Sequence, residues 1–276
     1  MLTDEEFRLF RNMIYDESGM YLKEAKKDFL EHRVQKRMQA TGTATPYWYY
    51  RHVTANRETE LPSLLDAMTV NETSFFRNGP QIDLFRKNIM KDLLAQKATT
   101  AWRKLRIWSA GCSTGEEPYT IAICVLEAIP DPEKWDIRIF ASDLSMKALE
   151  VASRAVYAEQ RVKHNVPDEL VPKYFDRVGD GYRVKDNVKR LVVFDYHNLK
   201  HENGLTALDA IFCRNVMIYF DEEEQKRVVE KFYRSLNPGG YLLIGHAESL
   251  QGMHTQFQFF YQNKGTAYKK PAQEGV

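Results

Sequence analysis

The chain has 276 residues, of which 43% are hydrophobic and 28% charged, the balance of a soluble globular protein. Its 39 lysines and arginines almost equal its 38 aspartates and glutamates, so a net charge of +1 creates no overall field that would attract nucleic acid. No apolar run approaches the roughly 20 residues that span a bilayer. The cysteines lack metal-ligand spacing, and we therefore expect no metal site and a reduced, cytoplasmic compartment.

The first 70 residues predict a domain made of helices. Residues 3–6, Thr-Asp-Glu-Glu, form a capping box, in which Thr3 and Glu6 satisfy the first free amides of a helix. Pro46 follows a threonine and suits the first position of a later helix. Hydrophobic residues at helical spacing mark four helices, over about 3–14, over 26–39, from Pro46 onward and over 61–68.

The second of these helices carries a strip of positive charge. Arg33, Lys36 and Arg37 lie on one side of it, because residues three and four apart are neighbours on a helix. A solvated basic face is the ordinary explanation of such a strip. Docking of an acidic partner helix is the alternative, and the residues alone leave both open.

Residues 71–98 are predicted to link this domain to the next one. Their first part, 71–77, has the sequence Asn-Glu-Thr-Ser-Phe-Phe-Arg, and a helix is expected over about 81–97. The aromatic pair would anchor the segment as a lid over a neighbouring crevice, although a simple interdomain linker with an aromatic plug is the alternative. The polar side chains that such a lid would present are Asn71, Thr73 and Arg77.

From residue 99 to 270 strands and helices alternate, which predicts an α/β domain with a Rossmann-like, doubly wound and mainly parallel sheet. The Gly-Asp-Gly turn at 179–181 indicates a small antiparallel β-subdomain, inserted at about 176–195. Two last strands, near 256–262 and 265–270, are expected to form an antiparallel pair. The parallel strands are expected near 105–110, 137–142, 191–195, 208–213 and 241–245.

The first parallel strand runs into a glycine-bearing turn and a helix, over residues 104–120. Strand, glycine turn and helix form a ligand crevice at the carboxyl edge of an open α/β sheet. Gly111 and Gly115 let a ligand approach the backbone closely. Glu116 and Glu117 begin the helix and would repel a pyrophosphate, so S-adenosylmethionine, cationic and free of phosphate, suits this turn better than a dinucleotide. An ordinary strand–helix turn is the alternative.

Polar residues also follow the next strands. Asp143 stands where a carboxylate accepts hydrogen bonds from the ribose hydroxyls of a nucleoside, unless it only caps the following helix. Asn198 is placed to read the edge of adenine, with Leu199 against its face. Arg214 and Asn215 end a buried strand, and strand ends face the ligand in this architecture.

Four segments together resemble the CheR family of chemotaxis protein-glutamate O-methyltransferases. They are residues 71–77, Ser-Thr-Gly-Glu-Glu-Pro-Tyr at 113–119, Ala-Ser-Asp at 141–143 and Cys-Arg-Asn-Val-Met-Ile-Tyr-Phe at 213–220. They occur in order over nearly the whole chain, and the combination is specific although each piece is not. The resemblance implies S-adenosylmethionine contacts at Asn71, Thr73, Arg77, Glu117, Asp143, Asn198, Leu199, Arg214 and Asn215.

The resemblance also implies the reaction. The expected substrates are glutamate side chains on the helical cytoplasmic domain of a chemoreceptor, and the expected second product is S-adenosylhomocysteine. Receptor docking then becomes the better explanation of the basic strip. Family members that dock on a receptor's C-terminal pentapeptide carry a longer glycine-containing loop than residues 177–184 provide, so we expect no dependence on such a peptide. A monomer without nucleic-acid or membrane contacts is the expected state.

A glutamate carboxylate is already ionised at pH 7, because its ordinary pKa is near 4.3. Methyl transfer to it needs no general base, and we expect Arg77 to hold the carboxylate and Tyr219 to line the methyl-transfer channel. The His-Ala-Glu-Ser sequence at 246–249 is then expected to be structural. Two alternatives remain: a methyltransferase with another acceptor, and a non-catalytic module that binds the cofactor or its product and signals through the helical domain.

Overall fold

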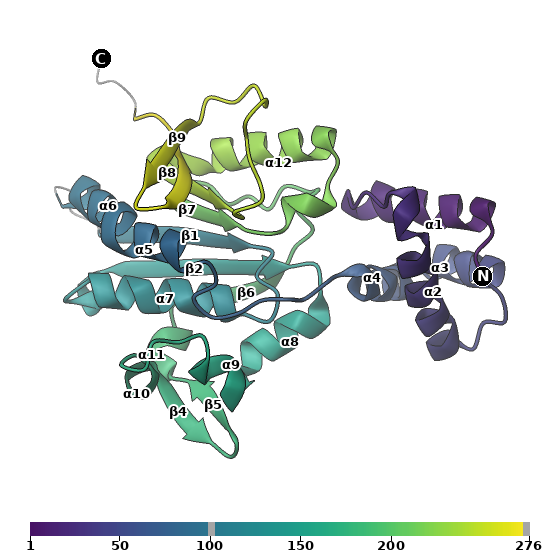
Figure 1. The fold of residues 1–276 in the computed structure, drawn as a ribbon, viewed down its shortest axis with the longest axis horizontal. Coiled ribbons are helices and arrows are strands. Elements are labelled where there is room, and N and C mark those ends of the chain that lie inside the picture. The colour runs from purple at the N-terminus through teal and green to yellow at the C-terminus, as the bar shows by residue number, and fades with distance from the viewer. Residues whose placement is uncertain (99–102, 273–276) are drawn as a thin grey trace.

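The computed structural model describes residues 1–98 and 103–272. A bundle of helices at the N-terminus lies beside a larger α/β domain, and an extended segment leads from the bundle across the larger domain (Figure 1). This two-part architecture agrees with the sequence prediction. The expected start of the α/β domain at residue 99 lies outside the described residues.

The N-terminal bundle, whose residues are all described, consists of α1 (Asp4–Ser18), α2 (Lys27–Thr41), α3 (Pro46–Ala55) and α4 (Arg57–Met68). The capping box before α1 is confirmed, because the Thr3 hydroxyl accepts from the Glu6 amide and the Glu6 carboxylate accepts from the Thr3 amide. Glycines in the left-handed conformation, Gly19 and Gly42, follow α1 and α2. The apolar faces of the helices form one core of their own.

The main sheet contains β1 (Lys104–Ala110), β2 (Asp136–Asp143), β6 (Val192–Tyr196), β7 (Leu208–Cys213), β8 (Leu236–Ile244), β9 (Gln258–Gln262) and β10 (Gly265–Lys269). Its strand order is β6-β2-β1-β7-β8-β10-β9, with the first five strands parallel and the last two antiparallel to their neighbours. From β1 the chain first moves outward through β2 and β6, and then returns to the other side of β1 with β7. The carboxyl ends beside β1 therefore border a crevice.

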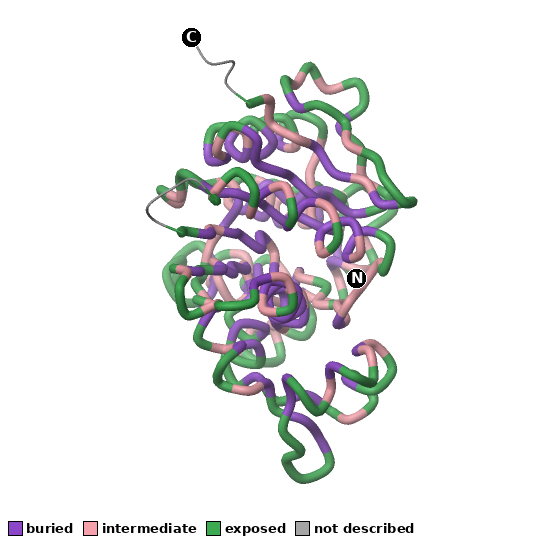
Figure 2. Tube along the Cα trace, turned by 90° about the vertical axis from the view of Figure 1, so that its left-hand side faces the viewer, coloured by how far each residue is buried: buried purple, intermediate pink, exposed green. Residues whose placement is uncertain are grey.

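Helices cover both faces of this sheet. One face packs against α5 (Gly79–Leu84), a π-helical turn (Phe85–Ile89), α6 (Met90–Lys97) and α7 (Glu116–Ala128), and the other against α12 (Glu222–Ser235). In β7 the side chains alternate between these layers, since Phe212 belongs to the first core whereas Ile211 and Cys213 belong to the second. Figure 2 shows the result, with buried strands inside and exposed helical turns outside.

A second, antiparallel sheet hangs below the main one (Figure 1) and consists of β3 (Val156–Ala158), β4 (Phe175–Val178) and β5 (Gly181–Val184) in the order β3-β5-β4. The predicted hairpin is confirmed, but its predicted limits are wrong at both ends. The subdomain begins earlier, with β3, and its expected last residues belong to β6. A strand as short as β3 has no detectable period, which is why the sequence did not reveal it.

Short helices complete the chain: α8 (Met146–Arg154), α9 (Glu159–Lys163), α10 (Val171–Tyr174), α11 (Asp186–Lys189), and 3₁₀ turns at Glu24–Lys26, Pro132–Lys134 and Met217–Tyr219. One further prediction needs correction, because β8 begins at Leu236 and not at Tyr241. Leu236 pairs with Leu208 and Tyr241 with Ala210, so the pairing register shifts where β8 carries the Asn-Pro-Gly-Gly sequence at 237–240.

Candidate cofactor and substrate site

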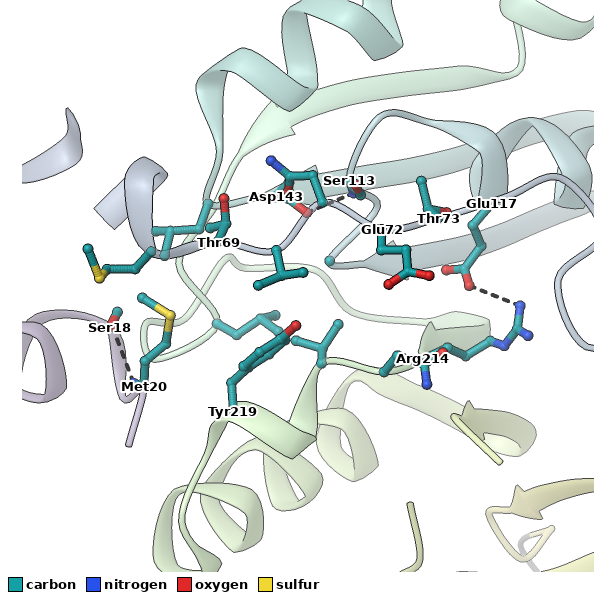
Figure 3. Close-up of a pocket in the computed structure, with 18 of the residues that line it drawn as sticks. Ser18, Met20, Thr69, Glu72, Thr73, Ser113, Glu117, Asp143, Arg214 and Tyr219 are labelled. Atoms are coloured by element: carbon teal, nitrogen blue, oxygen red, sulfur yellow. Dashed lines mark hydrogen bonds and ion pairs between the residues drawn. The ribbon is translucent and has the colours of Figure 1, made fainter. Parts of the chain in front are cut away.

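A pocket of about 970 Å³, including its open mouth, lies where the carboxyl ends of the central strands meet the helical bundle. Figure 3 shows Asp143 and Glu117 apart from each other along one wall of it, with Tyr219 on the opposite wall. The structure brings together the residues expected to bind the cofactor and those expected to act in methyl transfer: Asn71, Thr73, Arg77, Gly111, Glu117, Asp143, Asn198, Leu199, Arg214, Asn215 and Tyr219 all line this pocket. Gly115, which was also expected to let a ligand approach, is not part of the lining.

The turn after β1 needs its glycines. Gly111 and Gly115 have φ angles of +84° and +93°, which side chains rarely adopt. A Cβ on Gly111 would lie 2.4 Å from the Val216 side chain, and one on Gly115 would lie 2.8 Å from the Ala152 Cβ. The amide of Gly111 also donates to the Ser142 carbonyl, over 2.8 Å. The turn is therefore fixed between β2, α8 and the loop after β7.

The two consecutive glutamates at the start of α7 point to different places. Glu117 faces the pocket, where its carboxylate accepts from the Ser109 hydroxyl at 2.7 Å and from the Arg214 guanidinium at 3.2 Å. Glu116 is fully buried and pairs with Arg161 and the Thr114 hydroxyl instead. Burial raises the pKa of Glu117, against the attraction of Arg214. An added cation, such as the ammonium of an amino acid, would stabilise the charged form of this carboxylate.

Asp143 ends β2 with both carboxylate oxygens in hydrogen bonds to backbone amides, from Ser113 at 2.7 Å and from Ser145 at 2.8 Å. The N-cap of α8 is Ser145, whose hydroxyl accepts from the Ala148 amide, so Asp143 is not merely a helix cap. Burial raises the pKa of Asp143, while the two amides lower it. A carboxylate has room for more than two donors, which leaves acceptor capacity for ribose hydroxyls.

The loop after β6 joins the pocket to the bundle. The side-chain amide of Asn198 donates to the carbonyl of Glu17, near the C-terminal end of α1, over 2.7 Å, and its oxygen accepts from the Lys200 amide. One amide hydrogen of Asn198 is therefore engaged, and the second remains for a ligand. Lys200 extends from the same loop to the carbonyls of Tyr15 and Asp16. Asn198, which lines the pocket, and its neighbour Lys200 thus cap the last turn of α1.

The loop after β7 is shaped by a glutamate from the 246–249 segment. The Glu248 carboxylate accepts from the backbone amides of Asn215, Ile218 and Gly245, at 2.9, 3.2 and 2.5 Å. These bonds support Asn215 in a left-handed conformation, with φ of 60°, and lead into the turn that ends with Tyr219. The structural role expected for the 246–249 segment is confirmed for Glu248.

The 71–77 segment crosses the pocket as an anchored strip. Phe75 is buried edge-on against Tyr157 and Phe175, which belong to the β-subdomain. Arg77 donates to the Glu72 carbonyl at 2.9 Å, and its own carbonyl accepts from Arg214. The aromatic plug and the presentation of polar side chains to the pocket, given above as alternatives, therefore occur together.

The predicted basic strip is divided by the structure. Lys36 is exposed, and the Arg33 guanidinium lies 5.0 Å from the Phe29 ring centroid. Arg37 turns inward and forms two hydrogen bonds, of 2.9 and 2.8 Å, with the buried Glu60 carboxylate. The Arg37 guanidinium is thus engaged within the bundle, because α4 supplies a partner that helical spacing alone did not show.

Several residues that line the pocket were not predicted at the site, although some of them stand within the segments 71–77, 113–119 and 213–220. Ser113 lies within the glycine turn, and its side-chain oxygen is buried without a partner among the described residues. The presence of a serine in the sequence does not show that its hydroxyl is buried in a pocket. Others come from the bundle or from loops and reach the pocket only through the fold: Ser18, Met20, Met68, Thr69, Val70, Glu72, Ser74, Leu144, His197, Val216 and Phe220.

Comparison with known proteins agrees with this arrangement. The family model described as "CheR methyltransferase, SAM binding domain" matches residues 71–266, and "CheR methyltransferase, all-alpha domain" matches residues 5–69. The chain belongs to the CheR methyltransferase family. The pocket of this CheR methyltransferase lies mainly within the S-adenosylmethionine-binding match and receives a few side chains from the all-α match.

Curated relatives cover the chain almost from end to end. Chemotaxis protein methyltransferase 2 of Vibrio cholerae is 36% identical, with 98% of this chain and 94% of the relative aligned. The chemotaxis protein methyltransferase of Borreliella burgdorferi is 33% identical over 98% of this chain and 94% of its own length. That of Salmonella typhimurium is 35% identical over 93% of this chain and 88% of its own length. The recognition made from four short motifs is confirmed.

Two further findings concern the described residues of this CheR methyltransferase. No helix among them is long and apolar enough to cross a membrane. No three His, Cys, Asp or Glu side chains within ranges 1–98 and 103–272 are grouped to hold a metal ion. The pocket residues fit S-adenosylmethionine, since the lining includes the half-buried Glu117 carboxylate, suited to an ammonium, and the buried Asp143 carboxylate, suited to ribose hydroxyls.

Proposed function

We propose that this S-adenosylmethionine-dependent methyltransferase esterifies glutamate side chains on the helical cytoplasmic domain of a chemoreceptor. The proposal is supported by the relatives' names, and above all by one feature of the pocket. Arg77 and Tyr219 line the same pocket as the two cofactor-suited carboxylates, and the charge of Arg77 lies close enough to act on the Tyr219 hydroxyl. Such a site suits an acceptor that arrives already ionised.

Bound S-adenosylmethionine supplies a methyl group on a sulfonium. As the glutamate oxygen forms a bond to the methyl carbon, the carbon–sulfur bond breaks, and the charges of carboxylate and sulfonium disappear without movement of a proton. Strong clamping of the carboxylate would stabilise the ground state more than this less polar transition state. The residues of the pocket therefore act mainly by alignment, which contributes roughly 7–11 kcal/mol in well-oriented systems.

The proposed roles follow from position. Glu117 holds the cofactor's ammonium, Asp143 its ribose hydroxyls, and Asn198 with Leu199 its adenine. Arg77 directs the incoming carboxylate, and Tyr219 shapes the channel through which the methyl group passes. Burial raises the pKa of Tyr219, so its hydroxyl stays protonated at neutral pH and can donate a hydrogen bond.

For the receptor, the exposed Lys36 and the half-buried Arg33 on α2 supply positive charge for an acidic helix. The β-subdomain hairpin is short, with Gly179 and Asp180 as its two turn residues, and we propose docking that does not need a C-terminal pentapeptide. A monomer is sufficient for this function, because all proposed site residues come from one chain.

The decisive experiment uses methyl-labelled S-adenosylmethionine and chemoreceptor cytoplasmic fragments from the same organism. Labelled receptor is treated with mild base, and volatile methanol is counted. Base-labile label is the expected result, since only a carboxyl methyl ester releases methanol in this way. Stable label would indicate another acceptor. Absence of label with all receptors, while S-adenosylhomocysteine still binds, would favour the non-catalytic module.

A further inference from the structure

A buried lysine lies behind the loop that follows β6. Lys231 projects from α12 between Val228 and Phe232 of the second core and is only 4% exposed. Burial lowers the pKa of Lys231, against the attraction of Glu202 and Glu224. A charged side chain is costly to bury and is retained where its hydrogen bonds are needed. Lys231 belongs neither to the pocket lining nor to the residues implied by the family resemblance.

The hydrogen bonds of Lys231 go to a single short turn. Its Nζ donates to the carbonyls of Leu199 and His201, the latter at 2.7 Å. The turn closes on itself, because the His201 amide donates to the Asn198 carbonyl at 2.9 Å. The two carbonyls that Lys231 binds would otherwise face the protein interior without a donor.

The same turn supplies one wall of the pocket. Asn198 and Leu199 line the pocket, and the Leu199 side chain packs in the core that contains Val228 and Phe232. On the opposite side, Lys200 holds the turn to the last carbonyls of α1. The turn is thus held on its core side by Lys231 of α12 and on its other side by the contacts of Lys200 with α1 of the bundle.

We propose that Lys231 is a positioning residue for base recognition, which sets the backbone of the Asn198–Leu199 turn so that these residues discriminate adenine from other bases. Lys231 does not touch the ligand. The inference rests on the proposed cofactor contacts of the turn, but not on the identity of the methyl acceptor. It predicts that loss of Lys231 affects recognition of the base more than recognition of the amino-acid end.

The test is titration calorimetry on the full chain with two ligands, S-adenosylhomocysteine and S-inosylhomocysteine, which carries hypoxanthine in place of adenine. Lys231→Met keeps the length of the aliphatic part of the side chain and removes the terminal donor. We expect the preference of the wild type for the adenine ligand to fall about tenfold in this variant, a loss of the size that misplaced hydrogen-bonding groups produce. Lys226→Met, on the exposed face of the same helix, should keep the wild-type preference.

Lys231→Gln is a second test variant. Its donor nitrogen lies one bond nearer the backbone than the lysine Nζ and can reach one carbonyl at most. A fall in preference of about threefold is expected there. The inference would be overturned if Lys231→Met kept the wild-type preference for the adenine ligand. If that variant does not fold, an unchanged preference in Lys231→Gln would have the same meaning. A wild type that binds both ligands equally would also overturn the inference. If the wild type prefers adenine and the variants lose that preference while no receptor is methylated, the inference holds and the proposed acceptor is wrong.

Discussion

At the scale of single residues, neighbouring positions in the sequence have separate tasks. Glu116 and Glu117 both begin α7, yet one binds Arg161 in the interior and the other faces the pocket beside Arg214. Successive helix residues point about 100° apart, so only one of two adjacent carboxylates can face a given ligand. Of these two glutamates, only Glu117 is consequently expected to contribute to cofactor binding.

Glu117→Gln should raise the Kd for S-adenosylhomocysteine about 10- to 100-fold, because a charge-assisted hydrogen bond to the ligand's ammonium is lost. Burial raises the pKa of Glu117 in the free enzyme. Lowering the pH toward that raised pKa protonates the carboxylate, so wild-type affinity should fall as the pH falls. Calorimetry across pH tests this. A variant that keeps the wild-type pH dependence would show that another group binds the ammonium.

Arg77→Ala should reduce methyl transfer at saturating cofactor by about 100-fold or more, since alignment of the incoming carboxylate is its proposed contribution. Label transfer to a receptor fragment is the measurement. Lys87→Ala removes an exposed cation that pairs with Asp83 and serves as the control. Activity of Arg77→Ala within a few-fold of wild type would exclude this role for Arg77.

At the scale of elements, the turn between β1 and α7 is held by contacts from distant segments. Gly115 packs against α8, and the Tyr157 hydroxyl of β3 donates to the Thr114 carbonyl at 2.7 Å. The β-subdomain therefore supports the cofactor turn directly. Phe75 of the 71–77 segment packs edge-on against the same Tyr157 ring. The shape of the turn depends on this packing as well as on its glycines.

Gly115→Ala should lower the free energy of unfolding by about 2–4 kcal/mol, through left-handed strain and overlap with Ala152. Gly179→Ala is a matched control, because Gly179 also has a positive φ but has nothing within 4 Å of the added Cβ. Only the conformational cost of roughly 1 kcal/mol is expected there. Urea denaturation measures both, and equal losses would show that packing at Gly115 is unimportant.

At the scale of the whole molecule, polar contacts join the bundle to the α/β domain around the pocket. Asp66 of α4 accepts from the Ser145 hydroxyl at 2.5 Å, and Tyr15 of α1 donates to Asp221 at 2.7 Å. Ser145 in turn donates its amide to Asp143. The bundle is thus fixed beside the proposed cofactor contacts, while Lys36 on α2 remains accessible to a partner.

Lys36→Glu should raise the KM for the receptor about threefold or more and leave the Kd for S-adenosylhomocysteine unchanged, because rim charges act on encounter with a charged partner. Arg37→Glu should instead lower stability by about 3 kcal/mol, since it places a second carboxylate beside the buried Glu60. Steady-state kinetics and urea denaturation separate the two effects. An unchanged receptor KM in Lys36→Glu would exclude this face of α2 as the docking surface.

The sequence by itself determined the helical bundle, the succession of the main strands and helices along the chain, and the residues at the strand ends that meet at the carboxyl edge of the sheet. These features depend on local signals, namely capping, hydrophobic period and glycine turns, and on the rule that parallel strands place their carboxyl ends together. The eleven residues expected to bind the cofactor or to act in methyl transfer therefore line a single pocket.

The tertiary structure decided what depends on contacts between distant segments. It separated Glu116 from Glu117, turned Arg37 toward Glu60, added β3 to the small sheet and gave Lys231 its place behind the Asn198–Leu199 turn. Each of these outcomes is fixed by a partner 23 or more residues away. Hydrophobic period and local propensity carry no information about such partners, because they show which face of a segment is apolar and not which distant segment packs against it.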